Sequence, residues 1–174
     1  AEGKKRLMEG VDELMKAGAN AIKIEGAGAS LKPIQSLIKA DIPIMGHLGL
    51  TPQSVNKFGG FKIRGRDDEQ KAKLIEDSKK LEDAGVFALV LEMIPSDLAA
   101  EITASLTIPT IGIGAGNMTS GQVLVLHDLI GMNPAFNPKF VRRYIDCAGL
   151  IQEALNRYDA DVKSLDFPSK NESY

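Results

Sequence analysis

The chain has 174 residues, a formal net charge of −2 and a sequence pI of about 5.8. This length suits one domain with a real core, and the near-neutral charge argues against a nucleic acid or a membrane surface as partner. No apolar run approaches the roughly 18 residues of a membrane span, and residues 1–6 lack the apolar core of a signal peptide. We therefore expect a cytoplasmic protein. Cys147 is the only cysteine, which excludes an internal disulfide.

Short apolar runs alternate along the chain with segments of helical periodicity. Five of these runs end in a polar or glycine-rich tip and predict strands at 21–25, 42–47, 87–92, 109–113 and 123–127. Helices are predicted around and between them at 7–15, 31–39, 69–84, 96–106 and 138–162. The expected helix boundaries are Gly18, Ser30, Asp67 or Asp68, Gly85, Ser96 and Pro138. This alternation is typical of an α/β protein with a parallel sheet.

Charged and polar residues at the strand ends form the candidate site. Lys23 and Glu25 share one face of the first strand, and buried charge there is expensive unless it faces a polar pocket, a metal or a substrate. A simple buried ion pair is the alternative interpretation. Glu92 ends the third strand, where it is either a site residue or an ordinary acid. His47 and His127 also lie at strand ends, where supporting hydrogen bonds are favoured over direct catalysis.

Two loops differ from ordinary connections. Residues 48–66 show no clear period, and a loop of that length in a compact domain is commonly functional. The basic run within it, at 62–66, is interpreted as a solvated loop. The glycine run at 112–116 permits close approach of an anion to backbone N–H groups, or it forms a tight turn with positive φ. Its spacing does not match a dinucleotide-binding motif, and both interpretations stay open.

Six segments together resemble the ketopantoate hydroxymethyltransferase family. They are Lys-Ile-Glu-Gly at 23–26, Gly-His-Leu-Gly-Leu-Thr-Pro-Gln-Ser-Val-Asn at 46–56, Phe-Gly-Gly-Phe-Lys at 58–62, Leu-Val-Leu-Glu at 89–92, Ile-Gly-Ile-Gly-Ala-Gly-Asn at 111–117 and Leu-His-Asp at 126–128. The resemblance implies a (βα)8 TIM-type barrel of the phosphoenolpyruvate/pyruvate superfamily. The chain resembles only strands four to eight, so we expect residues 1–174 to form a single partial barrel domain without the first three βα units.

The resemblance also implies a reaction. The family transfers a hydroxymethyl group from 5,10-methylenetetrahydrofolate to 3-methyl-2-oxobutanoate, forming ketopantoate in pantothenate biosynthesis, and it uses Mg²⁺ and assembles as a decamer. By resemblance Glu92 is the general base, Lys23 binds the substrate's anionic end, and Glu25 is a metal-site carboxylate. Two aspartates that hold the metal and a substrate-contacting serine belong to the strands with no counterpart here. Neither Asp41 nor Asp128 is expected to replace them, so this chain alone is expected to be inactive.

Two other functions remain open at this stage. A non-catalytic half-barrel would serve as an assembly module, because an open barrel exposes strand edges that need a partner. A Mg²⁺-dependent lyase acting on 2-oxo acids would use the same superfamily fold. The run from Gly46 to Asn56 favours the transferase.

Overall fold

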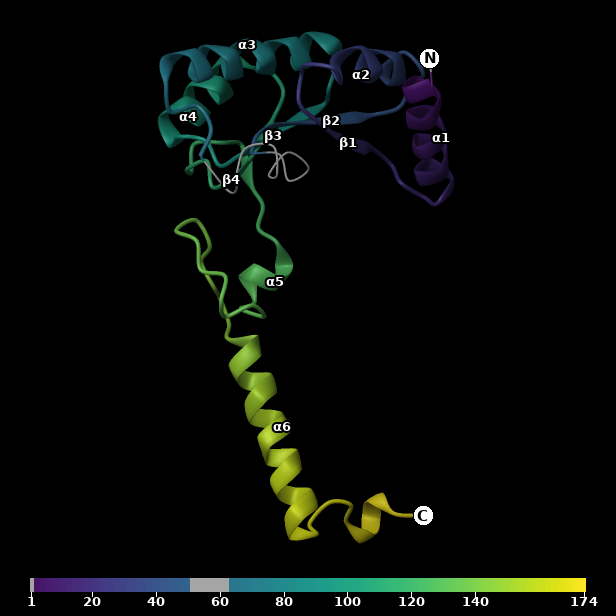
Figure 1. The fold of residues 1–174 in the computed structure, drawn as a ribbon, viewed down its shortest axis with the longest axis vertical. Coiled ribbons are helices and arrows are strands. Elements are labelled where there is room, and N and C mark those ends of the chain that lie inside the picture. Colours follow the sequence, from purple (N-terminus) through teal and green to yellow (C-terminus); the bar gives the residue numbers. More distant parts are fainter. Residues whose placement is uncertain (1, 51–62) are drawn as a thin grey trace. The chain divides into compact units, whose positions relative to one another are not determined.

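The computed structural model describes residues 2–50 and 63–174, and the chain divides into two compact units, residues 1–123 and 124–174. The first unit contains a parallel sheet whose strands follow one another in chain order (Figure 1). Its strands are β1 (Ile22–Glu25), β2 (Ile44–Gly49), β3 (Ala88–Glu92), β4 (Thr110–Ile113) and β5 (Gly121–Gln122). The predicted α/β class and parallel sheet are confirmed.

Helices of the first unit cover one face of this sheet. They are α1 (Glu2–Lys16), α2 (Leu31–Ile38), α3 (Asp68–Ala84) and α4 (Ser96–Ser105), and Figure 1 shows α2, α3 and α4 on the same side of the strands. Alternate strand residues, such as Leu89 and Leu91, pack with the helix residues Leu37 and Leu81 in a fully buried core. The remaining strand residues, including the charged ones, therefore lie on the opposite face. In the described ranges, none of the helices has the length and apolarity to cross a bilayer.

Helix caps follow the sequence at some ends only. The Asp67 carboxylate accepts a hydrogen bond from the backbone N–H of Gln70 at 2.8 Å, and α3 ends at Gly85 with a φ of 95°. Ser30 occupies the predicted N-cap position of α2, but the predicted capping by its side chain is wrong. Its backbone is already helical, whereas a capping side chain usually extends from a β-region residue, and its hydroxyl instead donates to the Gly26 carbonyl at 2.7 Å. Ser96 is the first helical residue and does not cap α4.

The predicted fifth strand over 123–127 is wrong. Strand β5 lies just before it, and only the Val123 N–H continues the ladder, donating to the Gly112 carbonyl at 3.0 Å. The chain then turns into a short helix, α5 (Leu126–Leu129). Val125 and Leu126 are 52% and 63% exposed. An apolar strand gains its stability from burial, so this exposed run has no such gain.

The last helix begins later than the sequence suggests. Helix α6 spans Cys147–Ser164 and is capped by Asp146, whose carboxylate accepts from the Gly149 N–H at 3.1 Å. The predicted start at Pro138 fails because the N–H groups of Tyr144 and Cys147 donate to carbonyls at the end of α5, at 2.8 and 3.0 Å. Those donors are no longer free to close helical turns. A short 3₁₀ helix, η2 (Lys170–Glu172), follows.

Candidate functional site

Strand register brings Lys23, His47 and Glu92 into a diagonal line across three strands. Glu25 of β1 pairs with His47 of β2, and Gly49 of β2 pairs with Glu92 of β3. Lys23 therefore lies two residues before His47 along the sheet, and Glu92 lies two residues beyond it. Neighbouring strands are about 4.8 Å apart and two residues span about 6.6 Å, a diagonal that long side chains can bridge.

The three side chains meet at His47, and we call them the polar triad. The Lys23 Nζ atom lies 3.3 Å from His47 Nδ1, and His47 Nε2 lies 3.2 Å from Glu92 Oε2. His47 is 0% exposed, whereas 17% of the Glu92 side chain is exposed. The Nε2 atom is close enough to Glu92 for an ion pair but lacks the geometry of a hydrogen bond to any described residue. A buried polar atom in that state costs about 1–3 kcal/mol, and such atoms concentrate at functional sites.

Lys23 and Glu25 are less buried than the sequence suggests. Lys23 is exposed and Glu25 half-buried, so the expectation of buried charge on β1 is wrong for Lys23. The two side chains form no ion pair in the described structure, which also rejects the simple buried ion pair. Strand β1 lies at the end of the sheet order, with β2 as its one strand neighbour among the described residues, and Lys23 is exposed.

Glu25 offers a carboxylate at the carboxyl end of β1 that no described residue engages through a hydrogen bond or an ion pair. Among those residues, no group of three His, Cys, Asp or Glu side chains could hold a metal ion. Mg²⁺ is commonly bound through one or two carboxylates and keeps several waters. Glu25 therefore fits as one oxygen donor of a Mg²⁺ site, and the described residues supply no complete set.

The backbone around Glu92 is held tightly on both sides. Met93 has a φ of 52°, in the left-handed region, and its N–H donates to the Ile113 carbonyl at 2.9 Å. The Glu92 carbonyl accepts from the Leu50 N–H at 2.8 Å. Gly49 has a φ of 98°, and a Cβ atom there would lie 2.0 Å from that carbonyl oxygen, so glycine is required. These contacts fix where the Glu92 side chain begins.

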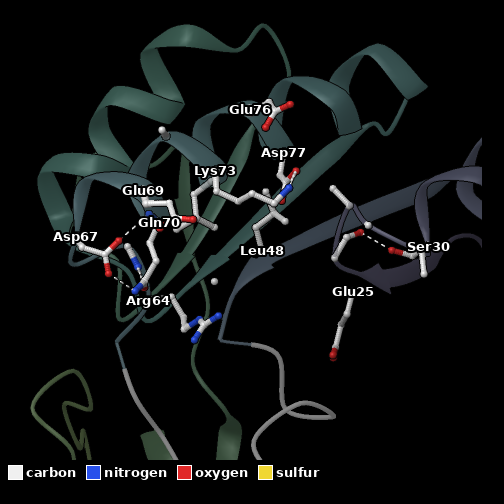
Figure 2. A pocket seen from close by; sticks show the side chains of 18 residues that line it. Glu25, Ser30, Leu48, Arg64, Asp67, Glu69, Gln70, Lys73, Glu76 and Asp77 are labelled. Atoms are coloured by element: carbon white, nitrogen blue, oxygen red, sulfur yellow. Dashed lines mark hydrogen bonds and ion pairs between the residues drawn. The ribbon is translucent and has the colours of Figure 1, made fainter. Parts of the chain in front are cut away.

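A cleft of about 1240 Å³ opens beside the polar triad without including it. It lies between the ends of β1 and β2, the segment 26–30 that precedes α2, and the first half of α3, and Figure 2 shows Glu25 and Gln70 on opposite sides of it. Arg64 is half-buried and lines the cleft, and its backbone N–H donates to the Met93 carbonyl at 2.9 Å. The interpretation of 62–66 as a solvated loop missed this residue, although the basic run itself was the available signal.

Other predicted site residues lie elsewhere. His127 and Asp128 belong to α5 in the second unit and do not end a strand. Asp41 precedes β2, at the edge opposite the polar triad, as expected. In the glycine run, Gly116 has a φ of 80°, and a Cβ there would lie 2.4 Å from that of Ser96, which favours the tight turn. Residues 48 and 49 of the long predicted loop belong to β2, and its residues 51–62 lie outside the described residues.

Comparison with known proteins gives a consistent result along nearly the whole chain. Residues 1–170 match the family described as ketopantoate hydroxymethyltransferase. A 3-methyl-2-oxobutanoate hydroxymethyltransferase from Bdellovibrio bacteriovorus is 55% identical over 96% of this chain and 64% of that protein. The protein of the same name from Francisella tularensis subsp. novicida is 49% identical over 96% of this chain and 63% of its own length.

The chain spans less than two thirds of the length of these curated relatives. Among solved structures, a dihydrodipicolinate synthase from Acinetobacter baumannii is 18% identical with a TM-score of 0.43, over 63% of this chain and 38% of that protein. A similarity of that strength has no bearing on function. The information on function therefore comes from the family match and from the residues at the carboxyl edge of the sheet.

Proposed function

Because the chain belongs to the ketopantoate hydroxymethyltransferase family, we propose that the protein carrying it transfers a hydroxymethyl group from 5,10-methylenetetrahydrofolate to 3-methyl-2-oxobutanoate. The observation that carries this proposal is the polar triad. It places a carboxylate, Glu92, and a cation, Lys23, on one face and at one edge of the sheet, linked through His47. A 2-oxo acid needs both groups, because it is an anion that must lose a proton from carbon.

Glu92 acts as the base in this proposal. The substrate loses a proton from C3, beside its ketone, and the Glu92 carboxylate accepts it. The hydrogen bonds around Met93 and the Glu92 carbonyl fix the backbone, so the carboxylate is presented from a rigid strand end. The electron pair released at C3 then forms a bond to the one-carbon unit of the folate, the two C–N bonds of that unit break to leave tetrahydrofolate, and water supplies the oxygen of the new hydroxyl group. The proton acceptor must lie within hydrogen-bond reach of C3, which a partly exposed side chain permits.

Lys23 and Glu25 hold the substrate and the metal in this proposal. Lys23 is exposed toward solvent and offers ammonium N–H groups to the substrate's carboxylate. Glu25 would hold Mg²⁺ together with oxygen donors that the described residues do not supply. When bound, the ion would act as a Lewis acid that offsets negative charge on the keto oxygen. The two β1 residues thus act on the substrate's oxygens and Glu92 on its carbon.

The proposal extends to the architecture of the chain. We propose that the strands correspond to strands four to eight of a (βα)8 barrel and that residues 1–174 form one partial domain of a cytoplasmic homo-oligomer. Parallel strands in chain order with helices on one face are the pattern of such a barrel. Barrel enzymes place catalytic residues at the carboxyl ends of their strands, where Glu25 and Glu92 lie.

Proton exchange tests the proposal without the folate. The protein carrying this chain is incubated with 3-methyl-2-oxobutanoate and Mg²⁺ in deuterated water, and loss of the C3 proton signal is followed by NMR. The transferase proposal predicts exchange without cleavage, and hydroxymethylation once 5,10-methylenetetrahydrofolate is added. Carbon–carbon cleavage of a 2-oxo acid would identify a lyase. No exchange at any Mg²⁺ concentration would identify a non-catalytic module.

A further inference from the structure

We infer that His47 is a positioning residue whose ring hydrogen lies on Nε2, and that it thereby ties Lys23 to Glu92. The roles of those two partners rest on the proposed function. The tautomer itself rests only on the two contacts of the ring, at 3.3 Å to Lys23 Nζ and 3.2 Å to Glu92 Oε2. His47 is fully buried, so bulk solvent does not reach its ring.

The partners at the two ring nitrogens differ in kind, and this difference selects the tautomer. A lysine ammonium has three donors and no acceptor, so the nitrogen facing it, Nδ1, must accept. An ionised carboxylate only accepts, so the nitrogen facing Glu92, Nε2, must carry the hydrogen. A hydrogen on Nδ1 would point at the N–H groups of Lys23. The imidazole with hydrogen on Nε2 alone satisfies both ends.

Strand pairing keeps the ring between its partners. His47 is the first residue of the carboxyl half of β2, and its residue partners are Glu25 on β1 and Val90 on β3. Val90 is buried and apolar, so it offers no competing hydrogen bond beside the ring. Among the described residues, the two polar contacts of the imidazole lie along the diagonal, toward Lys23 on one side and Glu92 on the other.

In this arrangement each partner uses some of its polar atoms to bind His47 and keeps the others for the substrate. One N–H of Lys23 is engaged by Nδ1, which leaves two for the substrate's carboxylate. Oε2 of Glu92 faces the Nε2 hydrogen, which leaves Oε1 to accept the proton from carbon. The Nε2 contact lacks hydrogen-bond geometry in this structure. We expect it to become a hydrogen bond when substrate engages Glu92, since catalytic hydrogen bonds often tighten on binding.

Two amide substitutions separate the two ends of the ring. In His47→Asn the shorter side chain carries its amide near the position of Nδ1, which retains an acceptor for Lys23 and removes the donor to Glu92. In His47→Gln the longer side chain carries its amide near the position of Nε2, which has the opposite effect. We expect His47→Asn to keep KM for the 2-oxo acid and to lower the C3 exchange rate about tenfold, the smaller end of the effect of supporting residues. His47→Gln should raise KM with a smaller change in rate.

A matched control replaces a buried polar side chain at the other edge of the sheet. Thr110→Val removes a fully buried hydroxyl at the start of β4. It should leave both KM and the exchange rate per folded molecule unchanged. Equal losses of rate and affinity in both His47 variants would show a merely structural role and would overturn the inference.

The tautomer is tested without substrate by NMR of the protein labelled with ¹⁵N-histidine. Nδ1 of His47 should resonate as an unprotonated nitrogen and Nε2 as a protonated one, with the signals assigned by their loss in His47→Gln. The reverse pattern, or two protonated nitrogens at neutral pH, would overturn the inference even if the enzyme is active. Conversely, a wild-type protein that exchanges no C3 proton but shows the expected tautomer would reject the proposed function alone.

Discussion

The two edges of the sheet differ in how fully their polar side chains are hydrogen-bonded. At the amino edge, the Glu82 carboxylate accepts from the Thr107 N–H at 2.6 Å, the Thr107 hydroxyl at 2.8 Å and the Ile108 N–H at 3.2 Å. At the carboxyl edge, both contacts of His47 are longer than 3 Å and its Nε2 atom makes no hydrogen bond to the described residues. Thus the Glu82 carboxylate at the amino edge has its hydrogen bonds supplied by the chain itself, whereas the Nε2 atom of His47 at the carboxyl edge does not.

The buried hydroxyl of Thr110, also at the amino edge, uses both its donor and its acceptor capacity. The Thr103 hydroxyl donates to the Ala99 carbonyl at 2.7 Å, so the Thr110 hydroxyl must donate to Thr103 across their 2.8 Å contact. The Thr110 oxygen also accepts from the Ser120 N–H at 3.3 Å. Satisfied groups stabilise a fold, whereas groups left open can bind something else. Changes at the two edges should therefore separate stability from activity.

The largest expected effect is that of Glu92→Gln at the carboxyl edge. The amide keeps the size of the side chain and its contact with His47 but cannot accept the C3 proton. In the protein carrying this chain, C3 exchange should fall by about 10²- to 10⁴-fold, the usual contribution of a general base. NMR measures the exchange, and calorimetry should show that the 2-oxo acid still binds. Exchange at the wild-type rate would remove Glu92 from the role of base.

Glu25→Gln should give the next largest effect, and it should depend on metal. An amide is a weaker ligand than a carboxylate, so the Mg²⁺ concentration needed for half-maximal exchange should rise by about 10- to 100-fold. Raising Mg²⁺ should recover much of the lost rate in this variant, whereas the loss in Glu92→Gln should persist. A loss in Glu25→Gln that no concentration of Mg²⁺ reduces would separate Glu25 from the metal.

Thr110→Val tests whether the hydrogen bonds at the amino edge stabilise the fold. Valine keeps the shape of threonine but removes a hydroxyl that makes two hydrogen bonds, to Thr103 and from the Ser120 N–H, so the free energy of unfolding should fall by about 1–3 kcal/mol. Urea denaturation measures the change. Thr110→Ser, which keeps the hydroxyl, should lose less. A valine variant as stable as wild type would mean that the amino edge does not depend on this hydroxyl.

The smallest effect is expected for Glu82→Gln, and it should depend on pH. The backbone N–H of Thr107 is the main cause that lowers the pKa of Glu82, aided by the Thr107 hydroxyl. A carboxyl whose pKa is lower in the folded than in the unfolded state stabilises the fold above its unfolded pKa, and this contribution is lost as pH falls through the folded pKa.

The free energy of unfolding of wild type should therefore exceed that of Glu82→Gln by about 1 kcal/mol near neutral pH. This difference in stability should disappear in acid. Denaturation at a series of pH values measures it. Glu101→Gln is the matched control, because Glu101 is an exposed residue of α4 that makes no hydrogen bond to described residues. A gap between wild type and Glu82→Gln that widens as pH falls would contradict the sign of this prediction.

Much of the first unit could be predicted because its signals are local. Strand β3 is an apolar run with an acid at the end, and β1 alternates isoleucine with charged residues and also ends in an acid. Helix α3 carries a capping Asp67 and a terminal Gly85 within its own sequence. The placement of Glu25 and Glu92 at one edge then follows from parallel strands, and that prediction is confirmed. The roles assigned to them by resemblance stay predictions.

The remainder depends on contacts between distant segments. The polar triad requires a register that no single strand specifies, because Lys23, His47 and Glu92 come from three strands. The start of α6 is likewise set by the N–H groups of Tyr144 and Cys147, which donate to residues near α5 instead of to their own turn. A pattern within either segment cannot reveal such a bond.

Met93 shows that a gain in stability and a loss of activity can come from one residue. A non-glycine residue at a φ of 52° costs roughly 1 kcal/mol, so an engineer seeking a more stable protein would replace it with glycine. The same change would loosen the peptide that directs the Glu92 side chain. Selection for thermal tolerance and selection for turnover should thus favour different residues at this position.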